Sequence, residues 1–174
     1  GTAQVEATLA LLDRAELAPG ATALVQLRLD EPVAALPGQR FILRGFTAIE
    51  GRGRTVAGGR VLAIAARRRR RGRPEEEEQL RILGGADADA RLVAVLKIAG
   101  PAGLTAAGLV GRTALAPKPV QAGLERLGAR GEVLLFDKER RAYVSGEVAR
   151  SLAERLGAGL AAFHRQKPLA AGMG

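Results

Sequence analysis

The hydrophobic pattern of this chain changes its period once, near an arginine run at residues 67–71, and this change constrains the fold most. Before the run, segments such as "QVEATLALL" and "ALVQLRLD" alternate apolar and polar residues, which is typical of half-buried strands. After the run, apolar residues recur every three to four positions, as in "ADARLVAVLKIAG", which indicates amphipathic helices. The pattern therefore predicts a β domain followed by a mostly helical domain.

The residues before position 67 predict a small antiparallel barrel or sandwich. Two further apolar runs, "FILR" and "GRVLAIA", follow the two alternating segments. Turn residues separate the runs at Pro19-Gly20, Pro37-Gly38 and Gly58-Gly59. Several short strands with regular turns favour a closed or sandwiched antiparallel sheet over residues 1–66.

The residues after the run predict a winged helix-turn-helix. Pro74 suits the first position of a short helix, and Asp87 and Thr105 are candidate caps of the next two. Pro117 opens a further helix, and two short strands follow it. We expect a linker with a short helix over residues 67–86, a winged-helix module over 87–145, and a helix opening another module over 146–174.

Composition limits the chemistry that the chain can perform. There is no cysteine, which excludes disulfides, thiolate metal sites and a cysteine nucleophile. The sequence has no G-x-x-x-x-G-K-[ST] phosphate-binding loop, no Ser/His/Asp set and no metal-ligand spacing. Its one histidine, His164, is expected to pack near a helix end. No apolar run reaches the roughly 18–20 residues of a membrane span. We expect no catalytic residue, metal or cofactor, and no membrane partner.

Two stretches of the first segment resemble the third domain of the translation elongation factor Tu family. They are "DEPVAALPGQRFILRG" and "GRGRTVAGGRVL". The longer stretch "LLDRAELAPGATALVQLRLDEPVAALPGQRF" is similar to the selenocysteine-specific branch, and "FHRQKPLAAGMG" resembles the start of that branch's second winged module. The resemblance implies a mixed fold, with a β-barrel like domain 3 of that family followed by an α+β winged helix. It also implies that the chain is an excised piece of a longer factor.

The resemblance carries expectations about partners. It implies that the chain helps to hold selenocysteinyl-tRNA, and that the longer protein reaches the ribosome and a messenger RNA hairpin at recoded UGA codons. GTP and Mg²⁺ would belong to a GTP-binding domain outside this chain. A cytoplasmic monomer is expected.

The strongest candidate site lies around the predicted glycine turn. Arginines beside glycines supply cations and accessible backbone N–H groups, which phosphate contacts require. The resemblance places this region against the T-stem side of the tRNA. The candidate RNA contacts are Arg44, Arg52, Arg54, Thr55, Gly58 and Gly59. An ordinary glycine hairpin with solvated arginines is the alternative.

The arginine run itself is interpreted as a linker with weak, non-specific attraction for RNA. Residues 67–73 hold six arginines, and the formal net charge of the whole chain is +9, so much of the net charge lies in this segment. No aromatic side chain stands among them to stack on a base, and like charges keep such a segment extended and solvated. The residues concerned are Arg67, Arg68, Arg69, Arg70 and Arg71.

The helix after Pro117 is where a DNA-binding winged helix would read bases. Its exposed positions offer a mixed set with an acid among the cations, which is a poor reader of base edges. These residues are Lys118, Gln121, Glu125 and Arg126. We therefore predict a spacer or docking module. The alternative is a winged-helix transcriptional regulator with a small β effector domain.

Overall fold

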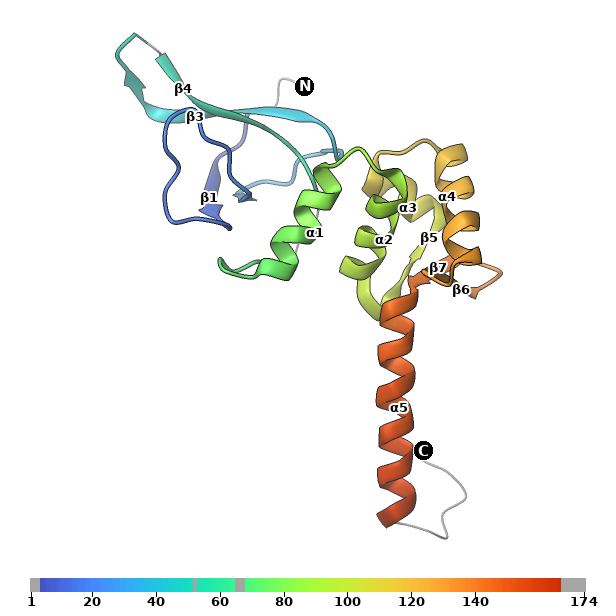
Figure 1. Cartoon of the computed structure of the whole chain (residues 1–174). Helices are drawn as coiled ribbons and strands as arrows, with labels where there is room; N and C mark the ends of the chain where they lie inside the picture. Colours follow the sequence, from blue (N-terminus) through green and yellow to red (C-terminus); the bar gives the residue numbers. More distant parts are fainter. Residues whose placement is uncertain (1–3, 52, 65–67, 167–174) are drawn as a thin grey trace. The chain divides into compact units, whose positions relative to one another are not determined.

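The computed structural model describes residues 4–51, 53–64 and 68–166 (Figure 1). The chain divides into two compact units. The first comprises Gly1–Arg91 with Gly111–Ala114, and the second comprises Leu92–Val110 with Leu115–Gly174. Among the described residues, no helix combines the length and the apolar character needed to cross a membrane.

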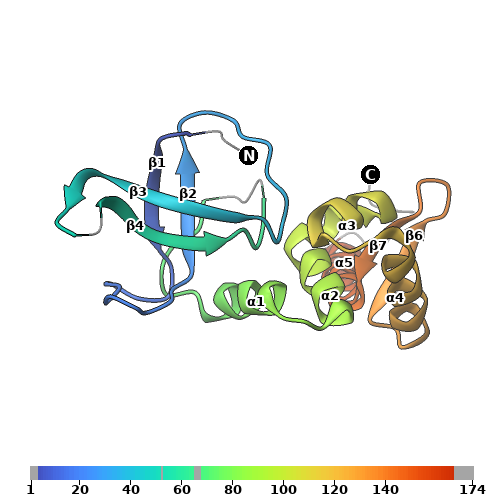
Figure 2. The ribbon, with the colours of Figure 1, turned by 90° about the horizontal axis from the view of Figure 1, so that it is seen from above.

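The first unit contains two antiparallel strand pairs, which run across one another in Figure 2. Turns at Pro19-Gly20 and Pro37-Gly38 are confirmed, because both glycines adopt a positive φ, of 79° and 87°. The antiparallel class predicted for this segment is confirmed, and the ladders of the described residues form two pairs rather than one closed ring. The strands are β1 (Ala7–Leu11), β2 (Val25–Leu29), β3 (Arg40–Ile49) and β4 (Gly53–Arg60).

The third predicted turn, at Gly58-Gly59, is wrong, because both glycines lie inside strand β4. They pair with Ile42 and Phe41 of β3, so the strand begins earlier than the sequence pattern suggested. The hairpin turns instead at Glu50 and Gly51. A methyl group on Gly59 would lie 2.4 Å from the Phe41 ring, so this glycine is needed to seat the ring.

Helix α1 (Pro74–Gly84) is fixed to the strands of the first unit. The Arg60 guanidinium donates a hydrogen bond of 2.6 Å to the carbonyl of Gly84, one of the carbonyls that a helix end leaves unpaired. The Gly72 N–H donates to the carbonyl of Leu12 at 3.2 Å. In the described part of the predicted linker, the chain is therefore held against the β structure rather than solvated throughout.

Asp13 joins the turn after β1 to helix α1. Its side chain is only 6% exposed, accepts a 3.2 Å hydrogen bond from the Leu24 N–H and lies 3.7 Å from the Arg81 guanidinium. Burial raises the pKa of this carboxyl, but hydrogen bonds from Arg14 and Leu24 and the charge of Arg14 outweigh it. The pKa is lowered overall, so the charged form of Asp13 stabilises the folded unit.

This lowered pKa predicts a pH-dependent contribution to stability. A depressed folded-state pKa gives stability that is present above the unfolded value of about 3.9 and is lost as pH falls through the folded value. We expect Asp13→Asn to destabilise the first unit by about 1–3 kcal/mol at neutral pH, with the difference shrinking below about pH 4. Urea unfolding across that range measures it. Asp30→Asn, at an exposed position, is the control, and a pH-independent difference would contradict the prediction.

The second unit has the topology of a winged helix, as the sequence predicts. Its three-stranded antiparallel sheet has the order β5-β7-β6. The helices bury a core of Leu92, Leu96, Leu109, Val120, Leu124 and Leu127. The elements in chain order are α2 (Ala88–Ala99), the 3₁₀ turn η1 (Gly100–Ala102), β5 (Leu104–Thr105), α3 (Ala106–Thr113), α4 (Pro117–Ala129), β6 (Val133–Asp137), β7 (Ala142–Ser145) and α5 (Gly146–Gln166).

Both predicted helix caps are confirmed. The Asp87 carboxylate accepts hydrogen bonds from the N–H groups of Asp89 and Ala90 at the start of α2, at 2.9 and 3.1 Å. The Thr105 hydroxyl accepts from the Gly108 N–H at 3.0 Å at the start of α3. Each cap satisfies N–H groups that the first helical turn leaves without an intrahelical partner.

Candidate nucleic-acid interface

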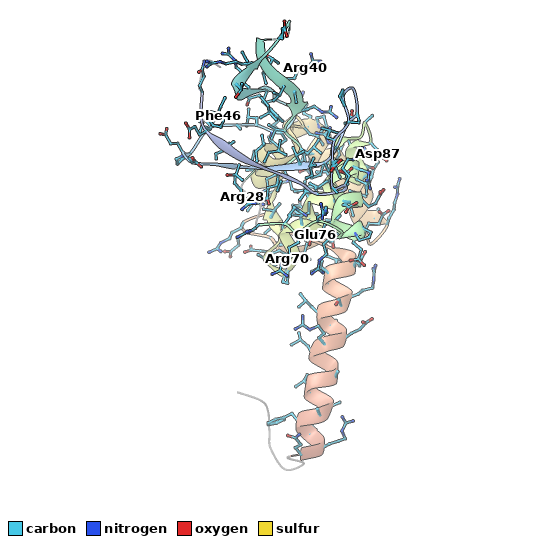
Figure 3. All side chains as sticks on the ribbon, turned by 90° about the vertical axis from the view of Figure 1, so that its left-hand side faces the viewer. Arg28, Arg40, Phe46, Arg70, Glu76 and Asp87 are labelled. Atoms are coloured by element: carbon cyan, nitrogen blue, oxygen red, sulfur yellow. The ribbon has the colours of Figure 1, made fainter. Side chains whose placement is uncertain are left out.

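Strand β3 presents a face that is both cationic and apolar. From Arg40 to Phe46 every second side chain is exposed, and the residues between them are partly covered. Ile42 is 70% exposed and Phe46 is 85% exposed, which is unusual for large apolar side chains. Arg40 and Arg44 alternate with them on this face, and Figure 3 marks Arg40 and Phe46.

Strand β4 adds to this face at the outer part of the hairpin. Arg44 pairs across the ladder with Thr55, and Arg54 and Thr55 are exposed. The structure thus brings Arg44 and Thr55 of the predicted contacts together, with Arg54 next in the chain. Arg52 lies outside the described residues. We call the exposed set of Arg40, Ile42, Arg44, Phe46 and Thr55 the hairpin face; Arg54, next to Thr55 on β4, is exposed on the opposite side of the strand.

The two predicted glycine contacts have different surroundings. Gly59 faces the Phe41 ring, so its lack of a side chain serves internal packing. A methyl group on Gly58 would make an ordinary contact of 3.5 Å with the carbonyl oxygen of Phe41. Gly58 is exposed on the strand, where a ligand can approach its backbone.

Sequence reasoning missed three members of the hairpin face, Arg40, Ile42 and Phe46. Their signal was present in "RFILRGF", where all three share the parity of Arg44. Arg60 stands opposite Arg40 in the ladder, but its guanidinium is bonded to Gly84 at the end of α1. Arginines interleaved with an exposed aromatic ring can contact phosphates and stack on an unpaired base.

The arginine run is not uniformly solvated, which corrects the prediction for Arg69. Its side chain is only 5% exposed and lies 2.7 Å from the Glu76 carboxylate of α1. Its backbone N–H donates a 2.9 Å hydrogen bond to the Gln26 side chain on β2. Arg69 is therefore a structural residue of the first unit, whereas Arg68, Arg70 and Arg71 are exposed. Arg67 lies outside the described residues.

The helix that would read DNA, α4, has its central amide engaged within the protein. The Gln121 side chain donates to the Glu125 carboxylate at 2.6 Å and accepts from the Arg141 guanidinium of the wing. A side-chain amide held at both ends cannot form the bidentate pair that adenine requires without breaking these bonds. Lys118, by contrast, is exposed. The geometry favours the predicted spacer or docking role over base reading.

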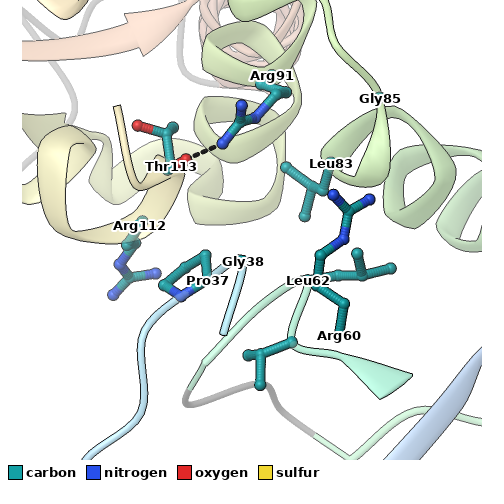
Figure 4. Close-up of a pocket in the computed structure, with 10 residues that line it drawn as sticks. Pro37, Gly38, Arg60, Leu62, Leu83, Gly85, Arg91, Arg112 and Thr113 are labelled. Carbon is teal, nitrogen blue, oxygen red and sulfur yellow. Dashed lines mark hydrogen bonds between the residues drawn. The ribbon is translucent and has the colours of Figure 1, made fainter. Parts of the chain in front are cut away.

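A phosphate-binding loop and a cluster of metal-ligating side chains are the features by which GTP and metal ions are commonly bound. The phosphate-binding loop is missing from the sequence, and the described residues contain no cluster of His, Asp or Glu side chains able to hold a metal. A small cavity in the first unit, about 40 Å³, is lined in part by Pro37, Leu62 and Leu83 (Figure 4). Arg91 donates to the Thr113 carbonyl beside it.

The chain combines a small antiparallel β unit that carries a basic hairpin with a winged helix, the two domains that the resemblance to translation elongation factors implies. Residues 1–68 match the family model described as the β-barrel domain of the selenocysteine-specific elongation factor. The chain is also 34% identical, over 173 residues, to the selenocysteine-specific elongation factor of Desulfomicrobium baculatum. No solved structure matches significantly.

The alignment with the Desulfomicrobium protein covers 99% of this chain and 26% of that relative. The chain belongs to the selenocysteine-specific elongation factor family, and it spans about a quarter of the length of the relative. The translation-factor assignment made from the sequence is thus confirmed.

Proposed function

We propose that this chain holds the RNA backbone of selenocysteinyl-tRNA and begins the arm that reaches a messenger RNA hairpin at a recoded UGA codon. The hairpin face carries the proposal, because it presents cations together with an exposed phenylalanine on one strand pair. Family membership supports the choice of tRNA as the partner. The protein would act as a monomer in the cytoplasm, where translation takes place.

The hairpin face would act by position and charge. Arg40 and Arg44 would neutralise backbone phosphates, and Arg54 would add a cation from the other side of β4. The exposed Gly58 backbone and the Thr55 hydroxyl could add hydrogen bonds. Phe46 would stack on an exposed base or cover a ribose. None of these contacts reads sequence directly, so selection among tRNAs would come from shape and from other domains.

The winged helix would act as a spacer. Binding the tRNA through one part of the protein and the messenger hairpin through another raises the effective concentration of the charged tRNA at the codon. The chain would contribute no covalent chemistry, and GTP with Mg²⁺ would bind in a part of the longer protein outside it. The DNA-binding regulator is not favoured, because Gln121 is engaged and because the family is an elongation factor family.

A paired titration tests the proposal. The chain is titrated with a selenocysteine tRNA transcript and, separately, with a pool of duplex DNA sites at physiological salt. We expect salt-dependent tRNA binding and only weak DNA binding that does not depend on sequence, because phosphate contacts dominate such interfaces. Sequence-specific nanomolar binding of duplex DNA would overturn the proposal in favour of the transcriptional regulator.

A further inference from the structure

A second cationic feature of the first unit lies on β2 and the arginine run, apart in sequence from the hairpin. A cavity of about 470 Å³ is lined by Arg28 of β2 and by Arg68, Arg69 and Arg70. We call it the Arg28 pocket. Figure 3 marks Arg28 and Arg70, with Glu76 of α1. Its described lining contains no carboxylate and no apolar side chain.

The wall of the Arg28 pocket is fixed by specific bonds. The Arg69 N–H donates a hydrogen bond to the Gln26 side chain. Three residues further along the run, the Gly72 N–H donates a hydrogen bond to the Leu12 carbonyl. The Arg69 guanidinium is held by Glu76 at 2.7 Å. These contacts anchor the run on β2, so Arg28 and the exposed arginines on both sides of Arg69 face a common space before any ligand arrives.

Arg69 has an unsatisfied hydrogen-bond donor, and positive charges outnumber negative ones in the pocket lining. Its Nε–H is buried and has no hydrogen-bond acceptor among the described atoms. One carboxylate, Glu76, pairs with the guanidinium, whereas the pocket is lined by four cations. A buried donor without an acceptor is costly, and charges in a partly desolvated site interact more strongly than in water. The site therefore favours an anion that several guanidinium groups can share.

We propose that the Arg28 pocket binds a phosphodiester of an RNA backbone. A phosphate accepts hydrogen bonds from several arginines at once, with geometry that matches the guanidinium fork. The described lining contains no hydrophobic residue that would favour an acyl chain or the hydrophobic side chains of a peptide. The identity of the RNA as tRNA rests on the proposed function, but the phosphate site itself rests on these arginines.

Paired substitutions of exposed residues test the pocket without disturbing buried Arg69. In Arg28→Gln with Arg70→Gln, we expect roughly tenfold weaker tRNA binding and a log–log salt slope smaller by about 1.5 units, since each phosphate contact accounts for about 0.7–0.9 units. Arg130→Gln with Arg155→Gln removes the same charge from exposed positions of the second unit and should leave the slope unchanged. If both double variants change the tRNA affinity and the salt slope equally, the proposal that the Arg28 pocket binds phosphate is wrong.

A second measurement separates the pocket from the proposed function. Inorganic pyrophosphate is added to ¹⁵N-labelled chain, and the Arg69 Nε–H resonance is followed. We expect a saturable shift that the Arg28/Arg70 variant lacks. No shift would overturn the pocket even if tRNA binds. A shift without any tRNA binding would keep the phosphate site and refute the tRNA role, and equal competition by polyglutamate would refute a phosphate-selective site.

Discussion

Replacing Arg44 and Arg54 by glutamine in the complete elongation factor should weaken tRNA binding roughly tenfold and reduce its salt slope by about 1.5 units. Both side chains are exposed, Arg44 on the hairpin face and Arg54 on the other side of β4. Each phosphate that loses its arginine regains its condensed counterions, so binding releases fewer ions and depends less on salt. Filter binding from about 0.05 to 0.2 M salt measures both quantities.

Two comparisons make the hairpin result specific. Arg130→Gln with Arg155→Gln removes two exposed charges elsewhere and should leave the slope unchanged. Phe46→Ala should weaken binding at every salt concentration with the same slope, because stacking releases no counterions. Phe46→Tyr should restore most of the affinity. If the Arg44/Arg54 variant keeps the wild-type slope, these arginines face only water and the hairpin face is not the tRNA contact.

Replacing Gly103 by alanine should destabilise the winged helix by about 2–4 kcal/mol. Gly103 has a φ of 59°, and a methyl group there would lie 2.4 Å from the carbonyl oxygen of Tyr143 and 2.6 Å from the Phe136 ring. The carbonyl belongs to strand β7, so relief requires the backbone of the sheet to move. Thermal unfolding, followed by circular dichroism at the helical signal, measures the loss.

Gly100→Ala is a matched control in the same turn. Gly100 also has a positive φ, of 64°, but a methyl group there would meet no atom within 4 Å. It should cost only the left-handed backbone penalty, about 1 kcal/mol. Equal costs at the two positions would mean that backbone conformation alone, rather than the contact with Tyr143 and Phe136, requires glycine at Gly103.

The helical half of the chain was predictable because its signals are local. Asp87 and Thr105 cap the helices that they were predicted to cap, and Pro117 begins α4. A cap satisfies N–H groups two or three residues away, so the residue and its effect lie in one short stretch. The strand that contains Gly58 and Gly59 was misjudged, because adjacent glycines are usually read as a turn.

The candidate site was predicted in part for a similar reason. Arg44, Arg54 and Thr55 were chosen from a local pattern of arginine and glycine, and all three are exposed on the hairpin. Phe46 was missed because a phenylalanine in a strand is expected to be buried, and exposure depends on what packs against that face. The role of Gly59 against Phe41 depends on a cross-strand partner 18 residues away.

In the arginine run, the sequence and the tertiary structure determine different properties. Sequence alone determined its charge, its place after the strands and the helix that begins at Pro74, because period, charge and proline are properties of neighbouring residues. Only the tertiary structure decided that Arg69 is buried against Glu76 while Arg68 and Arg70 face a pocket shared with Arg28. The described arginines of the run differ in role because burial and ion pairing depend on partners outside the run, such as Gln26 and Glu76.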